Sequence, residues 1–374
     1  MELLNFINKH DNWKELLQQA PYFLDIKEED GFTLLKYNQI NSDFSQDIVK
    51  ECRGIILDSN NKIVCWPFSK FFNYGEAYAD TIDWSSARVQ EKIDGSIIKL
   101  WYDENSSWRL STNGAINAYK VNLNMNELLQ ANCDFHTFGE LFEAAKNYNC
   151  IDLNKLNKNY TYMFELVSPY NKVVIAYPEI IINHIGTRDN ITGEELDVDI
   201  GVRKPKEYPI HTLEDCLAAA SELPADQEGY VVVDKYWKRV KVKNPVYLQL
   251  HRMVSNNQLK LKDILQMIFE NEQEEFLNYF PEYKPAFEDI ENKLQLIKTR
   301  LNDNRKRIIS ILGTNFTRKE FALEVIKSDK ANSDYYFKWF VDSNYTFEEW
   351  IRSISKDSLI SKLQMKELDD TIDN

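Results

Sequence analysis

The chain has 374 residues, 43% of them hydrophobic, and a net charge of −14 at pH 7. This length suits two or three globular domains. The acidic charge argues against binding nucleic acid through the overall field, although it leaves room for a local basic groove. No segment is as apolar as a membrane span, and the opening MELLNFINKHDNWKELL lacks the layout of a signal peptide. We therefore expect a cytoplasmic protein that does not enter a membrane.

The cysteines and histidines give no sign of a metal site or a disulfide framework. The five cysteines are odd in number, scattered, and form no CxxC pair, and the five histidines do not cluster. Free thiols in a reducing compartment are the expectation.

Strand patterns separated by turn signals fill the chain up to about residue 250. The predicted strand regions are 31–38, 53–68, 95–114, 160–167, 172–177, 179–188, 228–234 and 238–243. The region 53–68 is predicted to be a hairpin closed at residues 58–61. Helices are predicted at 124–148 and 212–223, the second with Thr212 and Asp215 at its N-terminus. This mixture predicts an α+β domain of antiparallel sheets with packed helices.

The pattern changes after Pro245. From about residue 255 to the end, apolar residues recur at helical spacing and no convincing strand interrupts them. We expect two domains, 1–250 and 251–374, the second all-helical. Its basic stretch 298–307 is either an RNA contact or a solvated face.

The stretch EKIDGSIIKLW, residues 91–101, places Lys92 in a KxDG sequence at the start of an apolar run. Alone this is weak evidence, because a surface lysine before a β-turn gives the same pattern. Downstream, Glu165 shares a strand face with apolar residues, and Glu228 begins another predicted strand. Lys241 and Lys243 lie on one face of a third strand together with Arg239.

These residue types suit nucleotide chemistry. A lysine attacks only as a neutral amine, and partial burial and nearby cations both favour the neutral form. Cations can also contact phosphate, and carboxylates can hold a ribose or a hydrated divalent cation. The combination predicts a lysine that attacks a nucleotide phosphate.

The ordered motifs Lys92-Ile93-Asp94-Gly95, Phe164-Glu165, Glu228-Gly229-Tyr230 and Lys241-Val242-Lys243 resemble those of the covalent nucleotidyltransferases, which comprise ATP- and NAD-dependent ligases and mRNA capping enzymes. ECRGI (51–55), KFFNYGE (70–76), KYN (36–38) and FELVSPYNKVVIAY (164–177) make the chain similar to the RNA ligase 1 family of T-even bacteriophages. The resemblance covers about residues 30–250 and is weak in the helical region.

The resemblance implies a role for each matching residue. Lys92 would carry AMP through a phosphoramidate, Glu165 would hold the ribose hydroxyls, and Glu228 would serve the metal. The other matching positions are Tyr37 near the nucleotide, Arg53 and Lys70 on the outer phosphates, Lys241 and Lys243 on the α-phosphate, and Tyr247, which the family needs. The alternatives are an ordinary strand aromatic for Tyr37, solvated charges for Arg53 and Lys70, and core packing for Tyr247.

Two positions depart from the family or match it weakly. Asn113 stands in STNG where a family member has a lysine, so the hold on the outer phosphates differs. A metal-linked aspartate of the family falls near Glu274, for which an acidic solvated helix face is the alternative.

The resemblance implies an ATP-dependent RNA ligase that uses magnesium, or manganese, and joins 5′-phosphate and 3′-hydroxyl RNA ends. Its partner would be RNA with single-stranded ends, such as nicked tRNA anticodon loops, and we expect a monomer. The alternatives are a DNA ligase or capping enzyme, which usually append an OB-fold after the last motif, and an inactive RNA-binding relative.

Overall fold

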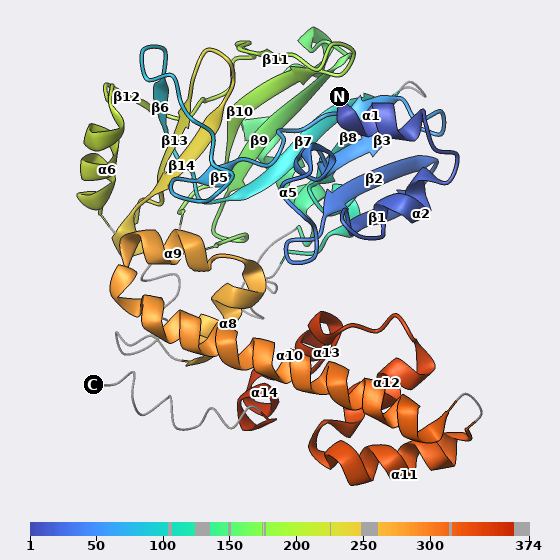
Figure 1. Ribbon diagram of the computed structural model, residues 1–374. Helices are drawn as coiled ribbons and strands as arrows, with labels where there is room; N and C mark the ends of the chain where they lie inside the picture. The colour runs from blue at the N-terminus through green and yellow to red at the C-terminus, as the bar shows by residue number, and fades with distance from the viewer. Residues whose placement is uncertain are drawn as a thin grey trace. The chain divides into compact units, whose positions relative to one another are not determined.

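The computed structural model divides the chain into two compact units, Met1–His251 and Arg252–Asn374 (Figure 1). It describes residues 1–103, 107–123, 135–148, 151–173, 175, 177–224, 226–247, 261–313 and 316–362. Each unit is treated by itself below. Among the described residues, no helix is long and apolar enough to cross a membrane.

The first unit contains three β-sheets. The first sheet has the order β1-β2-β3-β4, formed by Leu24–Glu29, Phe32–Tyr37, Arg53–Leu57 and Ile63–Cys65. The second has the order β11-β10-β9-β7-β8, formed by Glu195–Leu196, Ile181–Asp189, Tyr160–Val167, Ser96–Asp103 and Ser107–Thr112. The third has the order β12-β6-β13-β14-β5, formed by Glu207–Tyr208, Arg88–Glu91, Gly229–Val233, Arg239–Lys243 and Phe72–Asn73. All described pairings are antiparallel except that of β14 with β5.

Strand β9 lies in the middle of the second sheet because nearly all of its side chains can be buried. Every residue of β9 is buried except Tyr160 and Glu165, which are partly buried. Phe164 packs with Phe142 of a helix on one face of this sheet. On the other face, Trp101 of β7 contacts Phe32 of β2, which joins the second sheet to the first.

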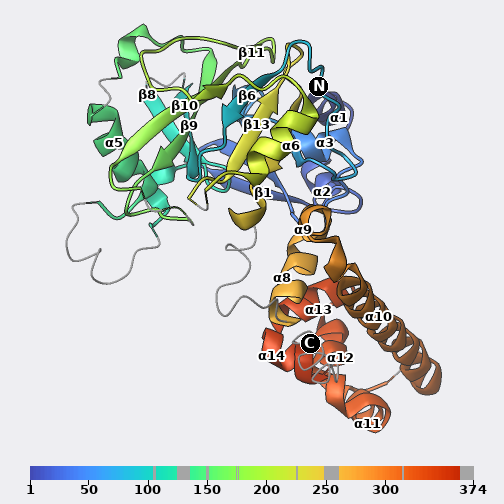
Figure 2. The same ribbon diagram turned by 90° about the vertical axis from the view of Figure 1, so that its left-hand side faces the viewer.

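Short helices cover the sheets of this unit. They are α1 Glu2–Ile7, α2 Trp13–Leu17, α3 Asp47–Glu51, α5 Phe138–Tyr148 and α6 Leu213–Ser221. In Figure 2, α5 lies beside the second sheet and α6 beside β13 of the third. The predicted cap of α6 is present, since Thr212 Oγ1 accepts a hydrogen bond from the Asp215 N–H at 3.1 Å.

Most of the predicted strand regions contain strands. The hairpin 53–68 forms β3 and β4, and Asp58 Oδ1 accepts hydrogen bonds in its turn from the N–H groups of Asn60 and Lys62. The predicted strand 172–177 is wrong, because its described residues are in no strand. Ile175 instead donates its N–H to the Asp94 carboxylate at 2.8 Å. Part of the predicted helix 124–148 lies outside the described residues, and α5 begins at Phe138.

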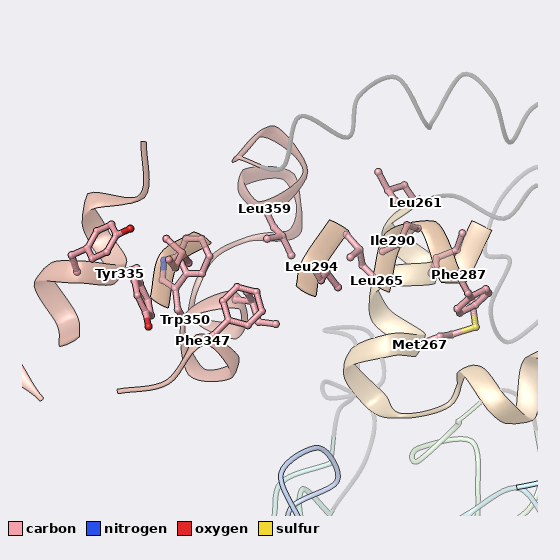
Figure 3. Packing of buried hydrophobic residues seen from close by; sticks show 14 of the residues in the cluster. Leu261, Leu265, Met267, Phe287, Ile290, Leu294, Tyr335, Phe347, Trp350 and Leu359 are labelled. Atoms are coloured by element: carbon pink, nitrogen blue, oxygen red, sulfur yellow. The ribbon is translucent and has the colours of Figure 1, made fainter. Parts of the chain in front are cut away.

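The described part of the second unit consists of helices only. They are α8 Leu261–Glu270, α9 Gln273–Tyr279, α10 Lys284–Leu312, α11 Arg318–Asp329, α12 Ser333–Val341, α13 Phe347–Ser353 and α14 Lys356–Lys362. Their apolar faces share one core, in which Leu265, Leu294 and Trp350 come from α8, α10 and α13 (Figure 3). The predicted fold class, an α+β region followed by a helical one, is confirmed.

Candidate active site

Lys92 follows β6 and is fixed beside β13 by the main chain. Its N–H donates to the Gly229 carbonyl at 2.9 Å, as the N–H of Glu91 does to the Lys206 carbonyl at 2.7 Å. The side chain then reaches Glu228, with Nζ 2.6 Å from Oε2. The Lys92 side chain is 20% exposed and that of Glu228 only 7%. The amine is therefore sheltered yet accessible from one side, and its counterion is almost fully buried.

The Asp-Gly pair after Lys92 sets the turn against the second sheet. The buried Asp94 carboxylate accepts hydrogen bonds from Ile175 N–H at 2.8 Å and from the Tyr247 hydroxyl at 3.1 Å. A β-carbon on Gly95 would lie 2.5 Å from the Leu166 carbonyl oxygen, closer than real contacts allow. Only glycine fits this position, so the KxDG sequence is explained by packing as well as by chemistry.

Tyr247 serves this turn. It is 3% exposed, and burial, with Glu228 and Asp94 nearby, raises the pKa of its hydroxyl. A hydroxyl that stays protonated remains a donor to Asp94. Tyr247 thus packs in the core, which was its alternative role, and also donates a hydrogen bond to Asp94 in the turn that follows Lys92.

Glu165 faces the site from β9. Burial raises the pKa of its carboxyl to about 8, and Glu228 and Asp94 add to the shift, whereas Lys92 and Arg53 oppose it. The carboxyl group is therefore protonated at neutral pH, and a protonated carboxyl can both donate to and accept from a hydroxyl.

A cavity of about 160 Å³ brings the predicted residues together. Its charged walls include Arg53, Lys92, Glu165, Arg239 and Lys241, and its apolar walls include Ile93, Ile97, Ile185 and Val231. The Phe71 ring lies between two of the cations, with its centroid 5.4 Å from the Arg53 guanidinium carbon and 5.2 Å from Lys241 Nζ. A cavity that combines apolar side chains with cations suits a nucleotide, with its base and its phosphate.

A β-bulge directs Arg53 into this cavity. The register of β2 with β3 shifts between Leu35 and Lys36, and Gly54 is the extra residue, with φ +85°. The Gly54 carbonyl accepts a hydrogen bond from Lys99 Nζ. Lys99 is fully buried, and this burial, together with nearby Arg53 and Lys36, lowers the pKa of its ammonium to about 8. A buried amine thus holds the bulge next to Arg53.

The backbone of Asn113 packs on the same bulge. A β-carbon on Gly54 would lie 2.7 Å from the Asn113 carbonyl oxygen and 2.8 Å from Lys99 Nζ. The buried Asn113 Oδ1 finds no hydrogen-bond donor among the described residues. Asn113 occupies the position where a family member has a lysine. In this structure the buried Lys99 of β7 lies near that position.

Other predicted residues lie around the cavity without lining it. Lys70 Nζ is 5.4 Å from the ring centroids of Tyr37, Phe44 and Phe72, so its ammonium sits among three aromatic rings. Lys243 of β14 is paired in register with Gly229 of β13, and its side chain is partly buried.

One placement differs from what the sequence suggested, and another follows the alternative given for it. Arg239 was expected to share an open basic strand face with Lys241 and Lys243, but it is buried and its guanidinium lies 2.6 Å from Glu195. Glu274 lies on α9 of the second unit and is exposed. Its link to a metal stays a prediction.

Sequence reasoning missed the structural role of Asp94 and of Lys99. The Asp94 contact was within reach, since a buried carboxylate must find donors. Lys99 gave no signal, because a lysine among alternating strand residues normally faces solvent.

No group of three or more His, Cys, Asp or Glu side chains is placed to hold a metal ion among the described residues. Magnesium usually binds through one or two carboxylates together with substrate phosphates. The residues present fit such an ion only when a nucleotide accompanies it, with Glu228 as the nearest carboxylate to Lys92.

Comparison with known proteins gives a family. The family model described as RNA ligase matches residues 51–247, just over half of the chain. The chain belongs to the RNA ligase family. The matched segment begins two residues before Arg53 and ends at Tyr247, so it contains every residue named above as lining the cavity.

Two relatives are similar in sequence to this RNA ligase family member over most of its length. An RNA ligase of Rhodothermus phage RM378 is 26% identical, over 84% of this chain and 85% of its own length. A protein of Autographa californica nuclear polyhedrosis virus, named as a bifunctional polynucleotide kinase/RNA ligase, is 28% identical over 76% of this chain. The chain spans only 44% of that viral protein.

Solved structures resemble it less. An archaeal ATP-dependent RNA ligase is 14% identical with a TM-score of 0.40, covering 63% of this chain and 61% of its own. A Naegleria gruberi RNA ligase mutant with ATP and Mn is 16% identical with a TM-score of 0.34, covering 44% and 51%.

Proposed function

We propose that the protein is an ATP-dependent RNA ligase whose nucleophile is Lys92. The observation that carries this is the placement of a sheltered lysine amine in a cavity with Arg53, Glu165 and Lys241, in a chain of the RNA ligase family. A lysine amine, the carboxyl groups of Glu91 and Glu165 and three further cations around one small cavity suit transfer of a nucleotide to the amine.

In the first step Lys92 forms a bond to the α-phosphorus of ATP, and the bond to pyrophosphate breaks. The ammonium must first lose a proton, and Glu228, 2.6 Å away, is placed to accept it. Arg53 and Lys241 would offset the phosphate charge. Lys70 and Lys243 would contribute from farther out, on the outer and the α-phosphate respectively.

Glu165 would bind the ribose. Its protonated carboxyl, with a pKa raised to about 8, can donate to one ribose hydroxyl and accept from the other. Tyr37 would lie near the nucleotide through the aromatic cluster that it shares with Lys70.

Magnesium or manganese would enter with ATP, held by phosphate oxygens and Glu228, and would neutralise phosphate charge. Glu274 remains a candidate second ligand. Glu228 would bind the ion as a carboxylate once the proton that it takes from Lys92 has passed to solvent.

The two later steps need RNA. An oxygen of a 5′-phosphate attacks the AMP phosphorus, the bond to Lys92 breaks, and the lysine regains a proton. The oxygen of a 3′-hydroxyl then attacks the activated 5′-phosphorus and AMP leaves.

We assign adenylyl transfer to the domain 1–250 and choice of RNA substrate to the domain 251–374. The basic stretch of α10 supports the second assignment less than its sequence suggests. Lys298 pairs with Glu348 at 2.6 Å and Arg300 with Asp329 at 3.7 Å. Nicked tRNA as substrate, a monomeric state and a cytoplasmic location stay predictions.

The test is incubation with radiolabelled ATP and magnesium, followed by denaturing electrophoresis and by ligation of RNA and of DNA ends. We expect covalent label on the wild type and none on Lys92→Ala or on Lys92→Arg, because a guanidinium stays protonated. Lys155→Ala, at a lysine whose side chain is 83% exposed, is the matched control and should label normally. Label on Lys92→Ala would overturn the assignment, and joining of DNA ends alone would make the protein a DNA ligase.

A further inference from the structure

A second and larger cavity, of about 440 Å³, adjoins the one that holds Lys92. The two share three lining residues, Phe68, Phe71 and Arg239, and Lys92 does not line the larger one. A phosphate attacked by Lys92 therefore belongs to the smaller cavity. Whatever occupies the larger cavity lies next to the reacting atoms.

The turn between β13 and β14 forms one wall with two consecutive aromatic residues. Tyr236 is 65% exposed, an unusual position for a large aromatic side chain. Trp237, with φ +62°, stands between two arginines, its ring centroid 5.5 Å from the Arg239 guanidinium carbon and 5.7 Å from that of Arg88. The indole is thus held in place, whereas the ring of Tyr236 is largely exposed and has Lys235 Nζ 4.9 Å from its centroid.

A buried ionic network also lines the cavity. Glu195 lies between Arg188 and Arg239, at 2.5 Å and 2.6 Å, and Arg188 also donates to the Pro67 carbonyl at 2.9 Å. The Arg239 guanidinium carbon lies 4.2 Å from the Phe68 ring centroid. A wall fixed in this way does not need to reorganise when a ligand binds.

The charges that line the cavity nearly cancel. Lys70, Arg188 and Arg239 face Asp80, Glu194 and Glu195. Lys70 would contact the outer phosphates of ATP before pyrophosphate leaves, but the balanced lining offers a phosphate chain little net attraction, whereas the flat face of a base gains from aromatic rings and guanidinium planes. The lining therefore fits a nucleoside better than a bare polyphosphate.

We infer that this cavity binds the terminal nucleoside of an RNA strand whose end reacts at Lys92, with its base stacked on Tyr236. The inference rests on the proposed function, in which an RNA end reacts at Lys92. The strand could carry the 5′-phosphate or the 3′-hydroxyl, and both would present the same ribonucleoside chemistry.

The experiment compares the full chain with Tyr236→Ala and Tyr236→Phe in separate steps. Adenylation by ATP alone should be unchanged in both variants. The KM for RNA should rise between about 5-fold and 100-fold in Tyr236→Ala, the range of one lost base–aromatic stack. Tyr236→Phe keeps the aromatic ring and should therefore have the wild-type KM for RNA. Tyr119→Ala, at a tyrosine that is 45% exposed and does not line the cavity, is the matched control and should leave the KM for RNA unchanged.

Pre-adenylated RNA and unmodified acceptor RNA are then varied one at a time. A rise in KM for only one of them identifies the strand that occupies the cavity. Photocrosslinking supports the result when RNA carrying 5-iodouridine at that end labels the peptide containing Tyr236.

An unchanged KM for both strands would overturn the inference while leaving the ligase activity in place. A raised KM for ATP in Tyr236→Ala would overturn it as well, by making the cavity part of the ATP site. Failure of the wild type to form the AMP adduct would instead refute the proposed function.

Discussion

Gly54→Ala tests whether the bulge beside Arg53 is as tightly enclosed as the geometry indicates. Gly54 has φ +85°, and an added β-carbon would lie within 2.8 Å of two Asn113 backbone atoms and of Lys99 Nζ. Gly31 is a matched control, because its φ is +82° and nothing lies within 4 Å of its added β-carbon. The two substitutions share the backbone strain and differ in the collision.

The magnitudes follow from these two contributions. Alanine in the left-handed region costs about 1–2 kcal/mol, and the lower entropy of the unfolded chain offsets about 0.4–1 kcal/mol of this. Gly31→Ala should therefore lower the free energy of unfolding by about 1 kcal/mol. Gly54→Ala adds the cost of overpacking, about 1–3 kcal/mol, because two of the three atoms in the way belong to the backbone and cannot rotate aside. We expect a loss of about 2–4 kcal/mol.

Urea denaturation of the two variants measures the difference. Adenylation should also slow at least about tenfold in Gly54→Ala, since any shift of β3 moves Arg53 and misplacement by about 1 Å can cost a hundredfold. In Gly31→Ala it should stay normal. Equal losses of stability in the two variants, with equal adenylation rates, would refute the account of the bulge.

Three further outcomes are expected. The carboxyl of Glu165 has a pKa of about 8 in the folded protein, so the folded state holds a proton that the unfolded state releases, and stability falls as pH rises from about 5 to 8. The urea midpoint of Glu165→Gln should fall less than that of the wild type over this range, and parallel curves would contradict the shift. Lys241→Ala should slow single-turnover adenylation at least about tenfold, because it removes a cation from the cavity that holds Lys92. A normal rate would place the phosphate elsewhere. A fragment of residues 1–251 should still adenylate Lys92 and lose preference for nicked tRNA over a linear strand, and an unchanged preference ratio would remove substrate choice from the second unit.

The strands of the first unit were predictable wherever local patterning and burial agree. Residues 160–167 read as a strand because they are apolar and aromatic, and β9 occupies the same residues. Residues 172–177 have the same composition but form no strand at their described positions, since Ile175 N–H bonds to Asp94 instead of a neighbouring strand. A long-range side-chain partner leaves no trace in a local pattern.

The candidate site shows the same limit to what a local sequence pattern predicts. The order of the motifs identified Lys92, Glu165 and Lys241, and these residues meet at one cavity. The ion pair that buries Arg239 depends on Glu195, which belongs to another sheet, so alternation along β14 alone made Arg239 look open. Sequence spacing predicts which residues share a face of one strand. Contacts between residues of different sheets can be known only from the folded structure.

The strand order of the third sheet bears on biosynthesis. Strand β5, at Phe72–Asn73, pairs with β14, at Arg239–Lys243, which is synthesised much later. A nascent chain therefore carries Lys92 before Glu228 and Lys241 exist beside it. We expect that Lys92 of a ribosome-bound chain is not adenylated until β14 has emerged. The lysine therefore does not react with ATP during most of the synthesis of the protein.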